Sequence, residues 1–163
     1  MSVERTRNYL SRFGMEDRII TFKESSATVE LAAKAAGTEP ARIAKTLSFS
    51  GKDTPVLIVT AGDTKIDNAK FKHFFGIKAH MLPFAEVEPL IGHAPGGVCP
   101  FGVNEGVKVY LDISMNRFRT MFPAAGEENN AIELTPDELE KYTDNEGWVD
   151  LCKGWQDQNQ TKL

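Results

Sequence analysis

The alternation of hydrophobic and polar residues predicts two neighbouring strands in the first half of the chain. Residues Ile43–Phe49, with the sequence IAKTLSF, alternate in the way typical of a half-buried strand. Residues 55–60, PVLIVT, form a more apolar strand, and residues 50–54 between the two predict a hairpin loop. Further short strands or extended segments are expected at residues 19–22, 78–82, 107–112, 119–124, 131–134 and 148–151.

Helices are predicted where apolar residues recur at helical spacing between capping residues. The expected helices cover residues 3–13, 27–36, 68–75 and 84–91, and a last one begins at residue 135. Thr28 and Asp67 are suitable N-caps, and Gly37 is a suitable stop. The sequence TPDE at residues 135–138 combines an N-cap threonine, a proline at the first helical position and the glutamate of a capping box.

The mixed order of these elements predicts an α/β fold rather than a doubly wound parallel sheet. We expect a single domain over residues 1–155, in which helices surround a mixed, curved central β-sheet, followed by a frayed polar tail at residues 156–163. With 163 residues, 41% of them hydrophobic and 26% charged, the composition is that of one ordinary globular domain.

Charge and cysteine content exclude several classes of protein. The net charge of −4 argues against a protein that clamps long stretches of nucleic acid, although it leaves room for a pocket that holds one nucleotide end. The two cysteines are far apart and predict neither a disulfide framework nor a zinc site. No apolar run approaches the length of a membrane span, and no signal core begins the chain, so we expect no membrane association and a cytoplasmic location.

The familiar catalytic motifs are missing. The sequence contains no nucleophile elbow GxSxG, no HExxH, no phosphate loop GxxxxGK[ST] and no dinucleotide fingerprint GxGxxG after a strand. His73 and His80 lack the spacing of metal ligands and are interpreted as surface or half-buried residues. We therefore predict no metal and no cofactor.

A loop rich in glycine and proline, HAPGGVCPFGV at residues 93–103, is the first candidate for function. Without side chains at Gly96 and Gly97, backbone amides could approach a ligand oxygen and stabilise negative charge. The alternative is a tight connection between a helix and a strand. His93 borders this loop, and Cys99 within it is either a nucleophile without an identifiable base or a small inert hydrophobe.

Lys45 is the second candidate, because it interrupts the apolar side of its strand. The alternation places it on the same face as Ile43, Leu47 and Phe49. An inward ammonium requires an anion, a cavity mouth or a depressed pKa. The alternative is a strand that begins one residue later, with the lysine stem reaching to water.

Together these residues resemble the YbaK/prolyl-tRNA-synthetase-associated domain family, which includes free-standing deacylases and the editing insertion of bacterial prolyl-tRNA synthetases. The resemblance rests on AKTL at residues 44–47 and GHAPGGVCPFG at residues 92–102, and extends over residues 16–151. Supporting segments are the alanine-rich helix that ends at Gly37, KIDNAKF before Gly76, and PAAG at residues 123–126 followed by AIEL at residues 131–134.

The resemblance implies hydrolysis in trans of a mischarged aminoacyl-tRNA, with the tRNA 3′ end and an aminoacyl-tRNA synthetase as partners. Its substrate is an activated ester, so neither a protein nucleophile nor a metal is required. Lys45 would hold a terminal phosphate or carbonyl, and amides around Gly96 and Gly97 would stabilise the oxyanion. Water, or a ribose hydroxyl that relays the proton, would complete the reaction. The substrate-binding residues that it implies are Phe22, Thr28, Thr46, His93, Val98, Cys99, Pro100, Ala124 and Gly126.

Three positions depart from the cysteinyl-tRNA deacylases of this family. Thr28 stands in place of an aromatic residue, Ala124 in place of a serine, and Ala131 in place of an aspartate. These changes affect the lining, where selectivity for the amino acid should reside, so alanine, serine or threonine is as good a candidate as cysteine. Two other functions stay open: a module that binds a tRNA end or a synthetase without turnover, and a pocket for a free amino acid or nucleotide.

Overall fold

A computed structural model describes residues 2–26 and 28–155 of the chain. The predicted polar tail at residues 156–163 lies outside the described residues, as does Ala27. None of the helices in the described ranges is long and apolar enough to cross a membrane.

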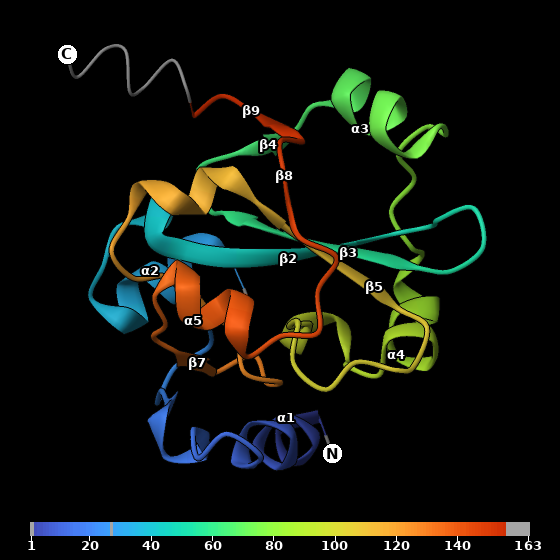
Figure 1. Cartoon of the computed structure of the whole chain (residues 1–163). Helices are drawn as coiled ribbons and strands as arrows, with labels where there is room; N and C mark the ends of the chain where they lie inside the picture. Colours follow the sequence, from blue (N-terminus) through green and yellow to red (C-terminus); the bar gives the residue numbers. More distant parts are fainter. Residues whose placement is uncertain (1, 27, 156–163) are drawn as a thin grey trace, which may run out of the picture.

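A five-stranded mixed sheet forms the centre of the fold, with the order β6-β2-β3-β5-β8 (Figure 1). The strands are β2 (Ile43–Phe49), β3 (Val56–Ala61), β5 (Lys108–Asp112), β6 (Phe122–Pro123) and β8 (Trp148–Val149). The hairpin pair β2–β3 is antiparallel, whereas the pairs β2–β6, β3–β5 and β5–β8 are parallel. The prediction of a mixed central sheet is confirmed.

Two small antiparallel ribbons complete the strand structure. The first joins β1 (Ile19–Thr21) to β7 (Asn130–Ile132), and the second joins β4 (Lys65–Ile66) to β9 (Cys152–Lys153). The hydrophobic pattern gave no sign of the second ribbon, because two-residue strands are too short to show alternation. The prediction of a strand over residues 119–124 was too long, and residues 78–82 contribute only the bridge between Met81 and Phe49.

The predicted helices are present with slightly shifted ends. They are α1 (Ser2–Ser11), α2 (Val29–Ala36), α3 (Asn68–Phe75), α4 (Phe84–Ile91) and α5 (Pro136–Lys141). Thr28 caps α2 by accepting from the Leu31 amide, and Asp67 caps α3 by accepting from two amides. The capping box of Thr135 and Glu138 is formed at α5. These caps are local, which is why the sequence predicts them well.

Helices cover both faces of the sheet (Figure 1). On one face, side chains of β3 and β5 pack with those of α1, α4 and α5: Leu57, Val59, Val109, Leu111, Leu10, Ile91 and Leu139. On the other face, Phe71 of α3 packs against Phe49, Val56 and Ile58. A smaller cluster joins α2 to the strands beside it through Ala32, Ala33, Ile43, Phe122 and Ala131. This third cluster carries the candidate site.

Candidate functional site

The site begins at a gap in the pairing along the outer edge of β2. In the described part of the chain, this edge is paired with β6 at Ile43 and Ala44 and bridged to Met81 at Phe49. Ser48 uses this edge as well, since its carbonyl accepts from the Leu82 amide. Backbone groups of a strand in an antiparallel pair alternate between its two edges, so Thr46 presents its N–H and C=O to the same gap.

A cavity of about 260 Å³ lies at this gap, between β2 and the turn that follows α4. Its walls come from α2, the strands β2, β6 and β7, and the glycine turn. The lining residues are Ser26, Thr28, Val29, Ala32, Ile43, Ala44, Lys45, Thr46, Leu47, Pro95, Gly96, Val98, Phe122, Ala124, Asn130 and Ala131. Six of the predicted site residues are therefore brought together here: Thr28, Lys45, Thr46, Gly96, Val98 and Ala124.

Lys45 is half-buried on the face of the sheet that the alternation indicated. Because β2 begins at Ile43, the alternative of a strand that begins later is wrong. The ammonium donates a hydrogen bond to the backbone carbonyl of Thr64. Burial lowers the pKa of Lys45, and the negative charges of Asp63 and Glu30 oppose this shift. An ammonium has three donors, so this bond leaves two of them for other partners.

The side chain of Thr46 points to the opposite face from Lys45 because neighbouring residues of a strand alternate. Its hydroxyl oxygen is buried and has no hydrogen-bond partner among the described residues. A buried hydroxyl without a partner is costly, typically by about 1–3 kcal/mol. Because Thr46 lines the cavity, a bound ligand could supply the missing partner.

The glycine loop forms a 3₁₀ turn at Pro95–Gly97. Neither Gly96 nor Gly97 has a positive φ, so backbone angle does not explain these glycines. At Gly97 a Cβ atom would lie 2.5 Å from the carbonyl oxygen of Gly126. Gly97 is thus required by the close packing of two turns, and its N–H donates to the Ala94 carbonyl. Gly97 does not line the cavity, so its amide is not placed to stabilise an oxyanion there, contrary to the prediction that grouped it with Gly96.

Gly96 is exposed and contributes directly to the cavity wall. Within the described residues, the hydrogen bonds of the turn use the Gly97 amide and leave the amides of Gly96 and Val98 available. Two backbone donors beside a cavity are a suitable arrangement for a developing oxyanion. The backbone amides of Gly96 and Val98 are therefore the groups of this turn that are best placed to stabilise an anion.

The structure places His93 and Cys99 in the core and not in the cavity wall. His93 Nε2 lies 2.7 Å from the carbonyl oxygen of Phe101 and 3.6 Å from Cys99 Sγ. Burial lowers the pKa of His93, against the effect of the Phe101 hydrogen bond. Burial also raises the pKa of Cys99 to about 11, which keeps the sulfur a thiol and favours the inert alternative.

Three more of the predicted substrate contacts lie outside the wall. Phe22 packs behind it, against the cluster formed by α2, β2, β6 and β7. Pro100 is buried and lines a separate depression next to α1. Gly126 is buried, adopts φ 99° and faces Gly97. These positions support the site through packing, since they do not reach the cavity.

Asn130 is a wall residue that the sequence analysis missed. It is buried, and its side-chain oxygen accepts from the amides of Ala125 and Glu127 while its amide donates to the Ala125 carbonyl. It thereby fixes the turn that carries Ala124. Its bonds close the turn directly before β7, and an asparagine beside a glycine-containing turn was the local signal that could have indicated it. No group of three or more His, Cys, Asp or Glu side chains suited to a metal occurs in residues 2–26 and 28–155.

Fold and site thus define a single α/β domain with a small cavity between a sheet edge and a glycine turn. Residues 23–142 match the family model described as the aminoacyl-tRNA editing domain, and the chain belongs to this family. The resemblance proposed from Lys45 and the glycine loop is confirmed at the level of the family.

Individual relatives agree with this assignment. The chain is 49% identical to "Uncharacterized protein YwhH" of Bacillus subtilis over 96% of its own length and 100% of that protein. It is 30% identical to "Putative Cys-tRNA(Pro)/Cys-tRNA(Cys) deacylase EbsC" of Enterococcus faecalis, over 75% and 76% of the two chains. It is 29% identical to a proline–tRNA ligase of Bacillus pumilus, but this match spans only 16% of the ligase.

A solved structure confirms the fold class. The crystal structure titled "Crystal structure of a putative trans-editing enzyme for prolyl tRNA synthetase" superimposes with a TM-score of 0.84 and 29% sequence identity. The match covers 94% of this chain and 98% of that chain.

Proposed function

We propose that this chain is an aminoacyl-tRNA deacylase that hydrolyses the ester of a mischarged tRNA in trans. The observation that carries the proposal is the shared cavity, which joins Lys45 and Thr46 of β2 to Gly96 and Val98 of the turn. These are the two features that the sequence singled out separately. Membership of the aminoacyl-tRNA editing domain family supports the choice of substrate.

The proposed reaction needs no protein nucleophile because the ester is already activated. A water oxygen attacks the carbonyl carbon, and the resulting oxyanion accepts hydrogen bonds from the amides of Gly96 and Val98. Each such donor contributes about 2.7–4 kcal/mol in comparable sites. The bond between the carbonyl carbon and the ribose oxygen then breaks. The proton from water passes to that ribose oxygen, directly or through the neighbouring ribose hydroxyl.

Lys45 is proposed to bind the substrate rather than to exchange protons with it. A compact ammonium at a cavity wall suits a phosphate or a carbonyl oxygen. Its hydrogen bond to the Thr64 carbonyl holds the side chain in place before substrate arrives. Such pre-organisation reduces the entropy that binding must overcome.

The amino acid is proposed to be small, because the cavity has a volume of only about 260 Å³ and must also hold the ribose that carries the ester. Ala32, Ala44, Ala124 and Ala131 line the cavity, together with the hydroxyl-bearing Thr28 and Thr46. Alanine, serine and threonine are therefore candidates beside cysteine. Since one methylene changes the free energy of binding by only about 1–3 kcal/mol, the lining does not by itself select one of these amino acids.

A synthetase is the proposed carrier of the substrate. The matched segment of proline–tRNA ligase is part of a much longer chain. A free-standing editing domain would need such a partner if its own contacts reach only the tRNA end.

A panel of mischarged tRNAs tests the proposal, with the wild type, Lys45→Ala and Lys108→Ala assayed side by side. Lys108 is an exposed lysine of β5 that does not line the cavity, and it serves as the matched control. We expect hydrolysis of one or two members, a loss of about 100-fold or more in Lys45→Ala, and little change in Lys108→Ala. If the wild type hydrolyses no member of the panel, the alternative of a binding module without turnover is favoured instead.

A further inference from the structure

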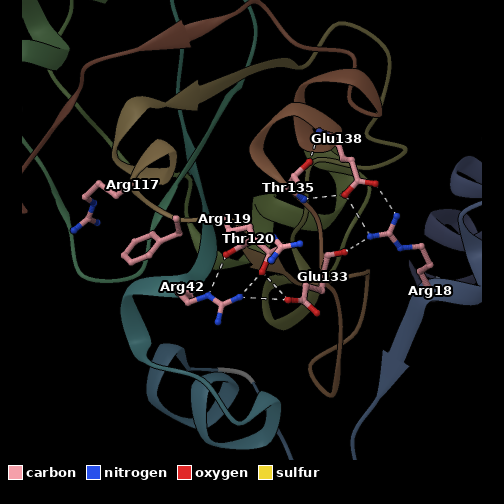
Figure 2. Close-up of a pocket in the computed structure, with 9 residues that line it drawn as sticks. Arg18, Arg42, Arg117, Arg119, Thr120, Glu133, Thr135 and Glu138 are labelled. Atoms are coloured by element: carbon pink, nitrogen blue, oxygen red, sulfur yellow. Dashed lines mark hydrogen bonds and ion pairs between the residues drawn. The ribbon is translucent and has the colours of Figure 1, made fainter.

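A second and larger depression, of about 670 Å³, lies on the surface beside the cavity (Figure 2). Four arginines from segments far apart in the sequence line it, together with one aromatic ring. The lining residues are Arg18, Arg42, Arg117, Phe118, Arg119, Thr120, Glu133, Thr135 and Glu138. Nothing in the deacylation chemistry described above uses them.

The lining carries four guanidinium groups against two carboxylates, in a protein whose net charge is −4. Both carboxylates are already engaged. Glu138 lies 2.8 Å from Arg18, and Glu133 lies 3.3 Å from Arg42. Asp63, outside the lining, engages Arg117 in the same way, so the local excess is one positive charge, that of Arg119. On an acidic protein this excess favours an anionic ligand at this place.

Three of the arginines are held in position by the fold. The Arg18 guanidinium donates to the Glu133 carbonyl, and the Arg42 guanidinium donates to the carbonyl and hydroxyl of Thr120 (Figure 2). Arg117 forms a two-pronged pair with Asp63, at 3.0 and 2.6 Å. Their positive charges are therefore fixed in space, and binding need not order them.

Arg119 differs from these three. It is exposed, and its side chain has no hydrogen bond or ion pair with the described residues. Its donors remain free for a ligand, and a guanidinium matches the geometry of a phosphate. Arg119 is therefore the side chain whose removal reports binding without disturbing the fold.

Phe118 distinguishes a nucleotide from a simple anion. Its ring lines the depression, and the Arg117 guanidinium lies 4.8 Å from the ring centroid. Aromatic rings and arginine planes are the surfaces on which unpaired bases of single-stranded RNA stack. Phe118 also packs against the core, so the depression offers a base the part of this ring that stays exposed, beside the charge for a phosphate.

The depression and the cavity are built from the same three segments. Arg42 lines the depression and the next residue, Ile43, lines the cavity. Thr120 lines the depression and Phe122, two residues on, lines the cavity. Ala131 lines the cavity and Glu133, two residues on, lines the depression. The Arg42 guanidinium lies 5.3 Å from the Phe122 ring centroid. A chain of nucleotides that ends in the cavity could therefore continue into the depression.

We propose that this arginine depression binds backbone phosphates and an unpaired base of the single-stranded 3′ end of the tRNA, next to the nucleotide that carries the amino acid. The proposal rests on the proposed function, because it extends the same substrate. The depression would then be a local RNA-binding surface on a protein whose net charge is negative.

Direct binding of unacylated tRNA tests the proposal independently of catalysis. Affinity is measured at several salt concentrations for the wild type, Arg119→Gln, Arg119→Lys and Lys52→Gln. Lys52 lies in the loop between β2 and β3 and does not line the depression. Lys52→Gln therefore removes one positive charge at a distance from the proposed site. We expect Arg119→Gln to bind about tenfold more weakly, as for the loss of one charge-assisted hydrogen bond. Its salt slope should fall by about one, while Arg119→Lys retains most of the affinity and Lys52→Gln matches the wild type.

A second probe is the same tRNA without its unpaired 3′ nucleotides. We expect the wild type to bind it more weakly and Arg119→Gln to bind it no worse than the wild type. Equal affinities and salt slopes for Arg119→Gln and Lys52→Gln would overturn the proposal, as would equal binding of the shortened tRNA by the wild type. Displacement of tRNA by inorganic phosphate at equal concentration would also overturn it, in favour of a small-anion site. If the wild type binds tRNA as expected but hydrolyses no mischarged tRNA, the proposed deacylase function is refuted, whereas the proposed RNA-binding surface is not.

Discussion

The ammonium of Lys45 donates a hydrogen bond to the backbone carbonyl of Thr64, which follows the strand paired with β2. Thr64 lies in the short turn between β3 and β4, and its hydroxyl donates to the Thr60 hydroxyl and the Ala61 carbonyl at the end of β3. Lys45 pairs with Thr60 across β2 and β3, so strand register sets the lysine end of this contact, and the hydroxyl bonds of Thr64 hold the other end. A rigid scaffold of this kind positions a binding group accurately.

The first prediction concerns the pH dependence of stability that Lys45 causes. Burial lowers the pKa of Lys45 in the folded protein from the ordinary value of 10.5. Between the lowered folded pKa and 10.5, the unfolded chain binds more protons, so this group makes stability rise with pH. Below the folded pKa the cost of burying the charge is fully present. Lys45→Met should lack this rise.

The measurement is urea unfolding of the wild type and Lys45→Met at neutral and alkaline pH. The stability difference between the two proteins should shift in favour of the wild type as pH rises. Titration of Cys99 is common to both proteins and cancels in the difference. A difference that stays constant with pH would contradict the prediction.

The second prediction uses the buried hydroxyl of Thr46, which has no partner in the described structure. Thr46→Val removes it at nearly the same shape, so we expect stability to rise by about 1 kcal/mol. We also expect deacylation to fall by about tenfold or more, because a ligand in the cavity that Thr46 lines would supply the partner that this hydroxyl lacks. Chemical denaturation and single-turnover hydrolysis measure the two effects.

Thr60→Val is the matched control for Thr46→Val. Thr60 lies on the neighbouring strand, is fully buried and has its hydroxyl bonded to Ala61 and Thr64. The same substitution should lower stability there. If both variants lose stability, Thr46 has a partner in the folded protein and its role as a free ligand group is refuted.

The third prediction separates the two neighbouring glycines of the turn. A Cβ atom at Gly97 would meet backbone atoms of Gly126 and Glu127, whereas one at Gly96 would meet only the Glu128 side chain, at 3.1 Å or more. We expect Gly97→Ala to lower the free energy of unfolding by about 1–3 kcal/mol. Gly96→Ala should stay within about 0.5 kcal/mol of the wild type, because an exposed glutamate can move aside. Equal losses in thermal unfolding would show that the two positions are not distinct.

The fourth prediction concerns His93, whose pKa is lowered by burial from the ordinary value of 6.5. Above 6.5 the imidazole is neutral in both states and its stabilising contribution is complete. As pH falls from 6.5 towards the lower folded pKa, the unfolded chain binds the proton first, so stability is lost. His93→Gln should remove this part of the acid destabilisation.

Unfolding curves between neutral pH and pH 5 measure this effect. Exposed His73→Gln controls for the loss of an imidazole. We expect the slope of stability against pH to flatten in His93→Gln and not in His73→Gln. An unchanged slope in His93→Gln would show that the buried imidazole does not govern this range.

The sequence by itself determined the local structure and the two sides of the site. Helix caps at Thr28, Asp67 and Thr135, and the alternation around Lys45, depend on residues within a few positions of one another, and all of them are found in the structure. The glycine loop and the strand lysine were also sufficient to indicate the family.

Only the tertiary structure decided how distant segments meet. Gly97 is a glycine because Gly126 packs against it, and Lys45 is attached to Thr64. The arginine depression combines side chains as far apart as Arg18 and Arg119. Such contacts depend on strand order and register, which leave no periodic trace near the residues that they bring together.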